Sequence, residues 1–312
     1  MKKIAFLFPG QGSQKVGMGQ ELAQVDEQAR QIFAAAEEVS GLPITRLCFE
    51  GPMEELTQTI NLQPAVTAVN LAFLSAIEKA DILPSVCAGH SLGEYSALCA
   101  AGVISAVDCL KLVHRRGELM HREATMHEGA MSAVVGLTID KVAAITNQAG
   151  SAGIVAVANH NSAEQIVITG SPEGVAAAAQ GASAQGAKAI ALKVSGAWHS
   201  PLIKGAENDF KAFLAGIVFN QPRCDVIHNV TAAIEPDPNK IRSLLATQLC
   251  SPVRWYDTVL KMIEDQTEVF VEIGPGRVLT GLLKKTLPAG TTARVYNVYD
   301  LKTLEAFVRA EG

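Results

Sequence analysis

A serine set between two glycines is the strongest chemical signal in this 312-residue sequence. The motif Gly89-His90-Ser91-Leu92-Gly93 follows a short apolar segment and precedes a segment of helical composition. In that context G-x-S-x-G predicts a sharp strand-to-helix turn that presents the serine hydroxyl as a nucleophile. The free N–H groups at the start of the helix would then face an oxyanion formed beside Ser91. We therefore predict covalent acyl chemistry at Ser91 rather than a glycine-rich turn without chemistry.

A nucleophilic serine requires a base, and the sequence offers seven histidines. We choose His199 because it lies in the predicted loop 195–201, and loops on a rigid scaffold often carry catalytic residues. A purely structural histidine is the alternative. Asp108 and Asp140 lie between Ser91 and His199, but neither occupies the loop after a strand that a triad acid requires. A backbone carbonyl could orient the imidazole instead.

The loop after the first apolar run is a candidate for a second oxyanion donor. This loop, residues 10–17, fits neither glycine-rich phosphate-binding pattern, since Met18 replaces the required lysine and Lys15 replaces the third glycine. We therefore expect neither ATP nor NAD to bind there. The backbone N–H of Gln11 is the natural donor, and a plain tight turn is the alternative.

Arg116 is the candidate for selecting a charged substrate. It lies in a predicted helix over 106–124, at the border of a stripe of apolar residues. The neighbouring Gly117 would permit close approach by another element. A guanidinium at such a border can clamp a carboxylate through two hydrogen bonds. A snorkelling arginine or a structural ion pair is the alternative.

Strands and helices alternate along the chain, which indicates an α/β fold with a parallel sheet. The middle of the chain has the order βαββαβ, which is typical of a ferredoxin-like unit. We expect this unit as a small subdomain inserted into a larger one. The predicted boundaries are 1–124 and 196–312 for the large subdomain and 125–195 for the small one.

Three helices are expected close to these candidate residues. One covers 17–39, and a second covers 64–79 with Pro64 in its first turn. A third begins after the serine motif at 92–101, where Glu94 has the place of an acid favoured in a first helical turn.

Composition limits the compartment and the partners. Hydrophobic residues make up 48% and charged residues 18%, with a formal net charge of -5, so we expect no nucleic-acid binding. None of the six cysteines forms a C-x-x-C pair, which predicts reduced thiols in a cytoplasmic protein. No metal-binding spacing is present, and we expect no stretch of about 20 apolar residues that could span a membrane. We further expect a monomer.

Several motifs in one order make the chain closely resemble the bacterial malonyl-CoA:acyl carrier protein transacylases of fatty acid synthesis, which are related to polyketide acyltransferase domains. The resemblance covers essentially the whole length. Its motifs are Phe8-Pro9-Gly10-Gln11-Gly12-Ser13-Gln14, Gly89-His90-Ser91-Leu92-Gly93-Glu94, Arg116-Gly117-Glu118-Leu119-Met120, Asn159-His160-Asn161-Ser162, Ala197-Trp198-His199-Ser200, Gln248-Leu249 before Pro252-Val253-Arg254-Trp255, and Glu272-Ile273-Gly274-Pro275-Gly276.

The resemblance implies a hydrolase-like large subdomain with a ferredoxin-like insert, in agreement with the element pattern. It implies that malonyl-CoA acylates Ser91 with His199 as the base, and that Arg116 binds the malonyl carboxylate. The malonyl group would then pass to the phosphopantetheine thiol of an acyl carrier protein. Malonyl-CoA is a substrate in this scheme, and no cofactor is implied.

The resemblance also assigns supporting residues. The backbone N–H groups of Gln11 and Leu92 would form the oxyanion hole, and Leu92 is typical of malonyl-selective members. Gln248 would orient His199 through its main-chain carbonyl, which explains the missing aspartate. Trp198 departs from the phenylalanine that the family has before the histidine.

Alternatives to this function remain open. A serine esterase or thioesterase would share the serine motif, and a carrier-binding scaffold would keep the fold without an acyl-serine. The same acyltransferase could serve polyketide or malonate metabolism. The carrier proteins of the resembled family are acidic, so docking requires local basic residues. The available ones are Arg254, Lys261, Lys284 and Lys285.

Overall fold

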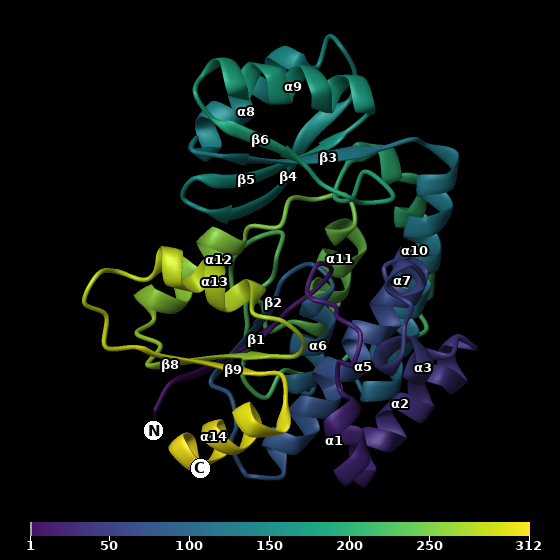
Figure 1. Ribbon diagram of the computed structural model, residues 1–312, viewed down its shortest axis with the longest axis vertical. Helices are drawn as coiled ribbons and strands as arrows, with labels where there is room; N and C mark the ends of the chain where they lie inside the picture. Colours follow the sequence, from purple (N-terminus) through teal and green to yellow (C-terminus); the bar gives the residue numbers. More distant parts are fainter. Residues whose placement is uncertain (1) are drawn as a thin grey trace.

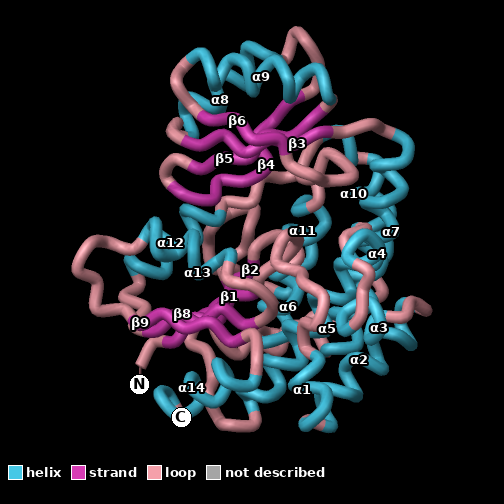
Figure 2. The backbone as a smooth tube through the Cα atoms, viewed as in Figure 1, coloured by secondary structure: helices cyan, strands magenta, loops and turns pink. Residues whose placement is uncertain are grey.

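The structure is a computed structural model that describes residues 2–312, and it contains two sheets, each the centre of its own subdomain (Figures 1 and 2). The strands of the large subdomain are β1 (Ile4–Phe8), β2 (Val86–Gly89), β7 (Asp225–Val226), β8 (Val269–Ile273) and β9 (Arg294–Val298). They form one sheet in the order β7-β2-β1-β8-β9, and every neighbouring pair is parallel. The predicted parallel α/β fold is therefore confirmed.

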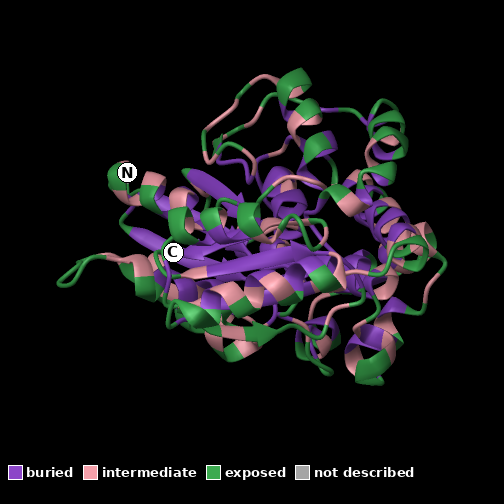
Figure 3. Ribbon diagram, turned by 90° about the horizontal axis from the view of Figure 1, so that it is seen from above, coloured by how far each residue is buried: buried purple, intermediate pink, exposed green. Residues whose placement is uncertain are grey.

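Alternate residues of the central strands face two separate apolar cores. In β1, Phe6 and Phe8 join the larger core, whereas Ala5 and Leu7 join the smaller one on the other face of the sheet. Because side chains of a strand alternate between faces, a strand covered on both sides must be apolar throughout. All five residues of β1 are buried, and Figure 3 shows the buried strands passing through the centre of the molecule.

Helices cover both faces of the large sheet. Two of them, α12 and α13, pack on the smaller core, and most of the others pack on the larger one. The helices of the large subdomain are α1 (Gln20–Val25), α2 (Glu27–Ser40), α3 (Ile44–Phe49), α4 (Met53–Leu56), α5 (Thr59–Glu78), α6 (Gly93–Ala100), α7 (Ala106–Met126), α10 (Gly205–Leu214), α11 (Pro238–Gln248), α12 (Trp255–Glu264), α13 (Val278–Thr286) and α14 (Leu301–Glu311).

The small subdomain has the predicted ferredoxin-like order of elements. Its elements are β3 (Ala130–Val135), α8 (Ile139–Ala149), β4 (Val155–Ser162), β5 (Gln165–Gly170), α9 (Pro172–Ala184) and β6 (Lys188–Ala191). The strands form an antiparallel sheet in the order β4-β5-β3-β6. One face packs against α8 and α9, and the other turns Met131, Ala133 and Val167 toward the core of the large subdomain. These elements all lie inside the predicted range 125–195.

Backbone contacts join the subdomains at two places. The connections that enter and leave the insert lie side by side, because a Cβ on Gly129 would come within 2.3 Å of the backbone nitrogen of Ala197. In addition, the N–H of His160 in β4 donates to the carbonyl of Val253 at 2.9 Å, and the N–H of Val253 donates to Ala158 at 2.8 Å. Since backbone is joined to backbone, the insert is held in a defined position over the large subdomain.

Two helix predictions were wrong in their boundaries. The helix predicted over 17–39 is two helices, α1 and α2, separated at Asp26, whose side chain accepts a hydrogen bond from the N–H of Ala29 and so caps the second helix. The helix predicted from residue 64 begins at Thr59, so Pro64 lies inside it rather than in its first turn. The first turn is set by packing, since Gly117 of α7 lies against the backbone of Thr59.

The same helix corrects the expectation that no stretch is long and apolar enough to span a membrane. In residues 2–312, α5 alone has the necessary length and composition. However, 78% of the apolar stretch within this helix is buried inside the protein, where the helix packs against α2 and α7. It therefore has the environment of a core helix.

Candidate active site

The serine motif forms the sharp turn that its sequence predicts. Ser91 connects β2 to α6 and has a φ of 51°, in the left-handed region that non-glycine residues rarely adopt. A Cβ on Gly89 would lie 1.9 Å from the backbone carbon of Gly93, and a Cβ on Gly93 would lie 1.9 Å from the carbonyl oxygen of Phe8. Only glycine fits at either position, so the spacing of the motif follows from the closeness of β1, β2 and α6.

Ser91 and His199 meet directly. The Oγ of Ser91 lies 2.7 Å from the Nε2 of His199, although 108 positions separate them in the sequence. The Nδ1 of His199 lies 3.0 Å from the carbonyl oxygens of both Gln248 and Ser251. Carbonyl oxygens only accept, so Nδ1 carries the proton and Nε2 is left free to accept the serine proton. The carbonyl of Gln248 therefore accepts from His199 as the resemblance implies, and the carbonyl of Ser251 is a second acceptor.

The surroundings of His199 keep its imidazole neutral. Burial and the nearby positive charge of Arg116 lower the pKa of His199 from 6.5 to about 3. Hydrogen bonds to the two carbonyls act in the opposite direction but are outweighed. A neutral imidazole is the form that can take a proton from a serine hydroxyl.

Arg116 is buried deeper than its sequence position predicts. The residue is 2% exposed, and its Nη2 donates to the Oγ of Ser91 at 3.0 Å and to the Oε1 of Gln248 at 3.3 Å. Its Nη1 donates to the Oε1 of Gln63 at 3.0 Å. Within residues 2–312, all its hydrogen-bond acceptors are thus neutral oxygens, and no carboxylate is directly paired with the guanidinium. The predicted close approach at Gly117 is also present, against the first turn of α5.

A cavity of about 110 Å³ joins these groups. Gln11 and Leu92, the predicted oxyanion donors, line it from the two loops that follow β1 and β2. Neither backbone N–H is among the donors of hydrogen bonds formed by the described residues. Apolar side chains from both subdomains complete the wall. The residues that line the cavity are Gln11, His90, Ser91, Leu92, Arg116, Met120, Met131, Asn159, Leu192, Val194, Trp198 and His199.

A second cavity of about 370 Å³ continues from the first toward the surface. The two share Gln11, His90, Asn159 and Leu192. The outer cavity lies between β5 of the small subdomain and α13 of the large one, with Lys285 on its lining. The Nε2 of the His90 imidazole lies 2.8 Å from the Oδ1 of Asn161, in the insert.

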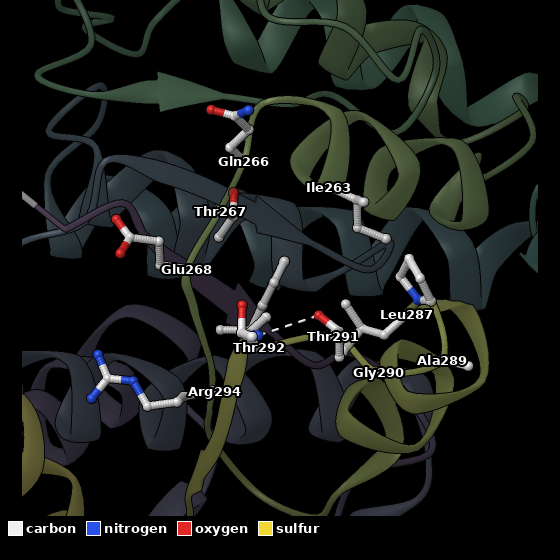
Figure 4. Close-up of a pocket in the computed structure, with 13 residues that line it drawn as sticks. Ile263, Gln266, Thr267, Glu268, Leu287, Ala289, Gly290, Thr291, Thr292 and Arg294 are labelled. Atoms are coloured by element: carbon white, nitrogen blue, oxygen red, sulfur yellow. Dashed lines mark hydrogen bonds between the residues drawn. The ribbon is translucent and has the colours of Figure 1, made fainter.

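A larger cavity of about 530 Å³ lies elsewhere, at the amino ends of β8 and β9 (Figure 4). Gln266, Thr267 and Glu268 border it just before β8, and Thr291 and Thr292 border it just before β9. Of the described residues that line it, none is a serine, histidine or cysteine. Ligands of parallel sheets bind at the carboxyl ends of the strands, which is where Ser91 lies and this cavity does not.

Comparison with known proteins agrees with this geometry. Residues 5–303 match the acyl transferase domain family. A malonyl CoA-acyl carrier protein transacylase of Bacillus subtilis (strain 168) is 41% identical over 311 residues, which cover 99% of this chain and 97% of the relative. The chain belongs to this transacylase family. The counterpart of Escherichia coli (strain K12) is 39% identical over 295 residues, covering 94% of this chain and 96% of the relative.

Solved structures of the transacylase family have the same fold. A crystal structure of an acyl carrier protein S-malonyltransferase from Vibrio cholerae is similar with a TM-score of 0.93 and 41% identity, covering 98% of this chain and 100% of the other. A malonyl-transacylase in complex with a type II PKS acyl-carrier protein has a TM-score of 0.94 and 38% identity, covering 99% and 100%. The predicted family and fold class are confirmed.

Sequence reasoning missed several polar residues that support the transacylase site. Glu94 was interpreted as a first-turn acid, yet it is 1% exposed and accepts three hydrogen bonds. The Oδ1 of Asn229 accepts a hydrogen bond from the N–H of Ser91, and the Oε1 of Gln63 accepts one from Arg116. An acid directly after G-x-S-x-G was the available signal for Glu94. The other two lie far along the chain from their partners and carry no local signal.

Proposed function

We propose that this protein transfers the malonyl group of malonyl-CoA to the phosphopantetheine thiol of an acyl carrier protein, through a malonyl-Ser91 intermediate, for fatty acid synthesis. This proposal rests on one observation. The Oγ of Ser91 lies 2.7 Å from the Nε2 of the neutral His199 imidazole and 3.0 Å from the Nη2 of the buried Arg116 guanidinium. A dicarboxylic acyl donor needs both neighbours, the base for its thioester and the cation for its free carboxylate. The relatives, malonyl CoA-acyl carrier protein transacylases and an S-malonyltransferase, support the same donor and acceptor.

In the first half-reaction, the Nε2 of His199 takes the proton of Ser91 as its Oγ attacks the thioester carbonyl. The oxyanion is stabilised by the N–H groups of Gln11 and Leu92, each of which lowers the barrier by about 3 kcal/mol. The carbon–sulfur bond breaks, the CoA sulfur takes the proton from His199 and leaves as the thiol, and the imidazole is neutral again. Arg116 binds the malonyl carboxylate throughout.

In the second half-reaction, the carrier thiol enters through the outer cavity. His199 removes the thiol proton, and the sulfur attacks the ester carbonyl of malonyl-Ser91. The ester bond breaks, Ser91 regains the proton from His199, and malonyl-carrier leaves. The cavity beside Ser91 is small and mostly apolar, which disfavours water as the competing acceptor.

Hydrolysis by an esterase or thioesterase is the alternative with the same nucleophile. It predicts acyl loss to water at the same rate with or without carrier, whereas transfer predicts rapid loss only when carrier is present. A role in polyketide or malonate metabolism would leave the chemistry unchanged and alter only the carrier. The expected cytoplasmic location and monomeric state stay predictions.

Intact-mass measurement tests the proposal. Mixing the protein with malonyl-CoA is expected to add one malonyl group, and adding pantetheinylated carrier is expected to remove it. In Ser91→Ala the mass gain is expected to be lost entirely, because the oxygen that forms the ester is gone. A malonyl adduct on Ser91→Ala would contradict the assignment, and a wild-type adduct that leaves equally fast without carrier would favour hydrolysis.

A further inference from the structure

A buried carboxylate outside the Ser91–His199 pair anchors the residues that hold the site. Glu94 of α6 is 1% exposed, and its carboxylate accepts from the Nδ1 of His228 at 2.8 Å and from the Nε2 of Gln248 at 2.6 Å. The backbone N–H of Asn229 donates to it at 3.3 Å. A buried carboxylate is stable only when its oxygens are satisfied, so the three donors and Glu94 fix one another in place.

Two of these partners hold the backbone on both sides of the nucleophile. The Oδ1 of Asn229 accepts from the N–H of Ser91 at 2.7 Å, and its Nδ2 donates to the carbonyl of Gly89 at 2.6 Å. The Nε2 of Gln248 donates to the carbonyl of Ser91 at 3.0 Å. Glu94 thus supports, through two side chains, the strained turn that aims the Ser91 hydroxyl.

The carboxylate also decides which way the Gln248 amide faces. A carboxylate can only accept, so Gln248 must present its NH₂ group to Glu94. Its Oε1 is then the atom that faces the Nη2 of Arg116 at 3.3 Å. If the amide turned over, its NH₂ would face the guanidinium, and two donors would repel each other.

The charge of Glu94 acts on Arg116 without pairing with it. Burial lowers the pKa of Arg116, and the negative charge of Glu94 is among the influences that oppose this shift. The Gln248 amide stands between the two charges, hydrogen-bonded to both. The guanidinium therefore meets the buried carboxylate only through this neutral amide and forms no ion pair with it.

We propose that Glu94 is a positioning residue for acyl selection. By fixing the amide of Gln248 it orients Arg116 toward the acyl carboxylate, and by fixing Asn229 it holds the turn at Ser91. The inference rests on the proposed function, because only a malonyl-type acyl group uses Arg116. Displacing the Glu94 carboxylate should therefore impair malonyl transfer more than acetyl transfer.

Two conservative variants separate position from charge. Glu94→Asp keeps the charge but withdraws the carboxylate from Gln248 by one methylene. Glu94→Gln keeps the length, and its carbonyl can still accept from Gln248. Its NH₂ group can donate to the Nδ1 of His228 if the proton of that ring moves to Nε2, which has no partner among the described residues.

The measured quantity is the ratio of kcat/KM for Ser91 acylation by malonyl-CoA to that by acetyl-CoA, from rapid-mix intact mass. In Glu94→Asp the ratio is expected to fall about tenfold, and in Glu94→Gln to stay within about twofold of wild type. Arg116→Ala, which removes the cation, gives the reference for a full loss of preference. Glu123→Asp is the matched control, since Glu123 is also 1% exposed but pairs with Arg122, and its ratio is expected to stay unchanged.

An unchanged ratio in Glu94→Asp would overturn the inference, and so would a loss in Glu94→Gln as large as that in Glu94→Asp. Either result leaves wild-type malonylation intact and the proposed function standing. Absence of any malonyl adduct on the wild-type protein would instead overturn the proposed function, and the inference with it.

Discussion

At the scale of residues, the base of this site is oriented by carbonyl oxygens and not by a carboxylate. His199 donates from Nδ1 to Gln248 and Ser251, each at 3.0 Å. A carboxylate in their place would lie close to Arg116 and attract its guanidinium. Neutral acceptors orient the imidazole without attracting Arg116, which is then free for the proposed carboxylate substrate. The missing aspartate is therefore consistent with an enzyme whose substrate brings its own carboxylate.

The neutral imidazole predicts a pH dependence of stability. The pKa of His199 falls from 6.5 to about 3 on folding, first through burial and then through Arg116. Below pH 6.5 the unfolded chain binds a proton that the folded protein excludes, so this residue makes stability fall as the pH drops toward 3. Between pH 7 and pH 5 the loss is about 2 kcal/mol of unfolding free energy.

Urea unfolding at pH 7 and pH 5 measures this effect. His199→Gln is expected to lose about 2 kcal/mol less than wild type between the two values, because glutamine does not titrate. His121→Gln, at an exposed position of α7, is the control and should follow wild type. Equal losses in wild type and His199→Gln would show that the imidazole is not held neutral by the fold.

At the scale of elements, the site depends on how closely β1, β2 and α6 approach one another. Gly89 and Gly93 allow the start of α6 to lie against the end of β1, and this places Leu92 beside the loop of Gln11. A Cβ on Gly10, next to that loop, would itself come within 2.5 Å of the carbonyl oxygen of His90. The proposed oxyanion donors, Gln11 and Leu92, lie on the two sides of this contact, so its spacing sets their separation.

Gly93→Ala tests that contact. The added methyl group would meet the carbonyl oxygen of Phe8 at 1.9 Å, and backbone cannot move away as a side chain can. We expect a loss of at least about 3 kcal/mol in unfolding free energy, measured by thermal or urea unfolding. Gly281→Ala in α13 is the matched control, because its Cβ would meet nothing within 4 Å, and it should be neutral or slightly stabilising. Comparable stability of the two variants would contradict the close packing.

At the scale of the whole molecule, the reaction takes place between the subdomains. Ser91, His199 and Arg116, the proposed nucleophile, base and carboxylate-binding residue, belong to the large subdomain, whereas Met131, Asn159 and Leu192 of the insert line the same cavity. The outer cavity opens between the insert and α13, with exposed Lys285 at its lining. A carrier that delivers its arm through this opening would lie over the end of α13.

Of the four basic residues expected to help docking, two are already paired. Arg254 and Lys261 each form an ion pair with an acid within the next turn of α12. Lys284 and Lys285, both exposed at the end of α13, form no ion pair with any described residue. They are therefore the better candidates for an acidic carrier.

The double variant Lys284→Glu with Lys285→Glu tests this docking surface. Transfer from malonyl-Ser91 to carrier is expected to slow about tenfold at low salt, with a smaller effect at high salt. Transfer to free pantetheine, which has no acidic surface, should be nearly unchanged. Lys302→Glu on α14 is the control, and an equal loss with both acceptors would indicate damage to the channel and not to carrier docking.

Features that depend on neighbouring residues could be predicted from the amino-acid sequence. Apolar runs alternating with helical patterns predicted the two subdomains. The glycines around Ser91 predicted the turn, because close backbone packing requires small residues within five positions of one another. Pattern alone left His199 as one choice among seven histidines, and the family resemblance assigned it together with Arg116 and Gln248. Glu94 looked like an ordinary first-turn acid.

Which polar groups contact one another became clear only from the folded chain. Ser91 and His199 are 108 positions apart, and Glu94 lies 134 positions from His228 and 154 from Gln248. Such pairs produce no periodic pattern in the sequence, because the two side chains form their hydrogen bond only after the strands and helices have packed. The burial of Arg116 was likewise set by the residues around it, because a helix's own sequence fixes which side it turns inward but not what covers that side.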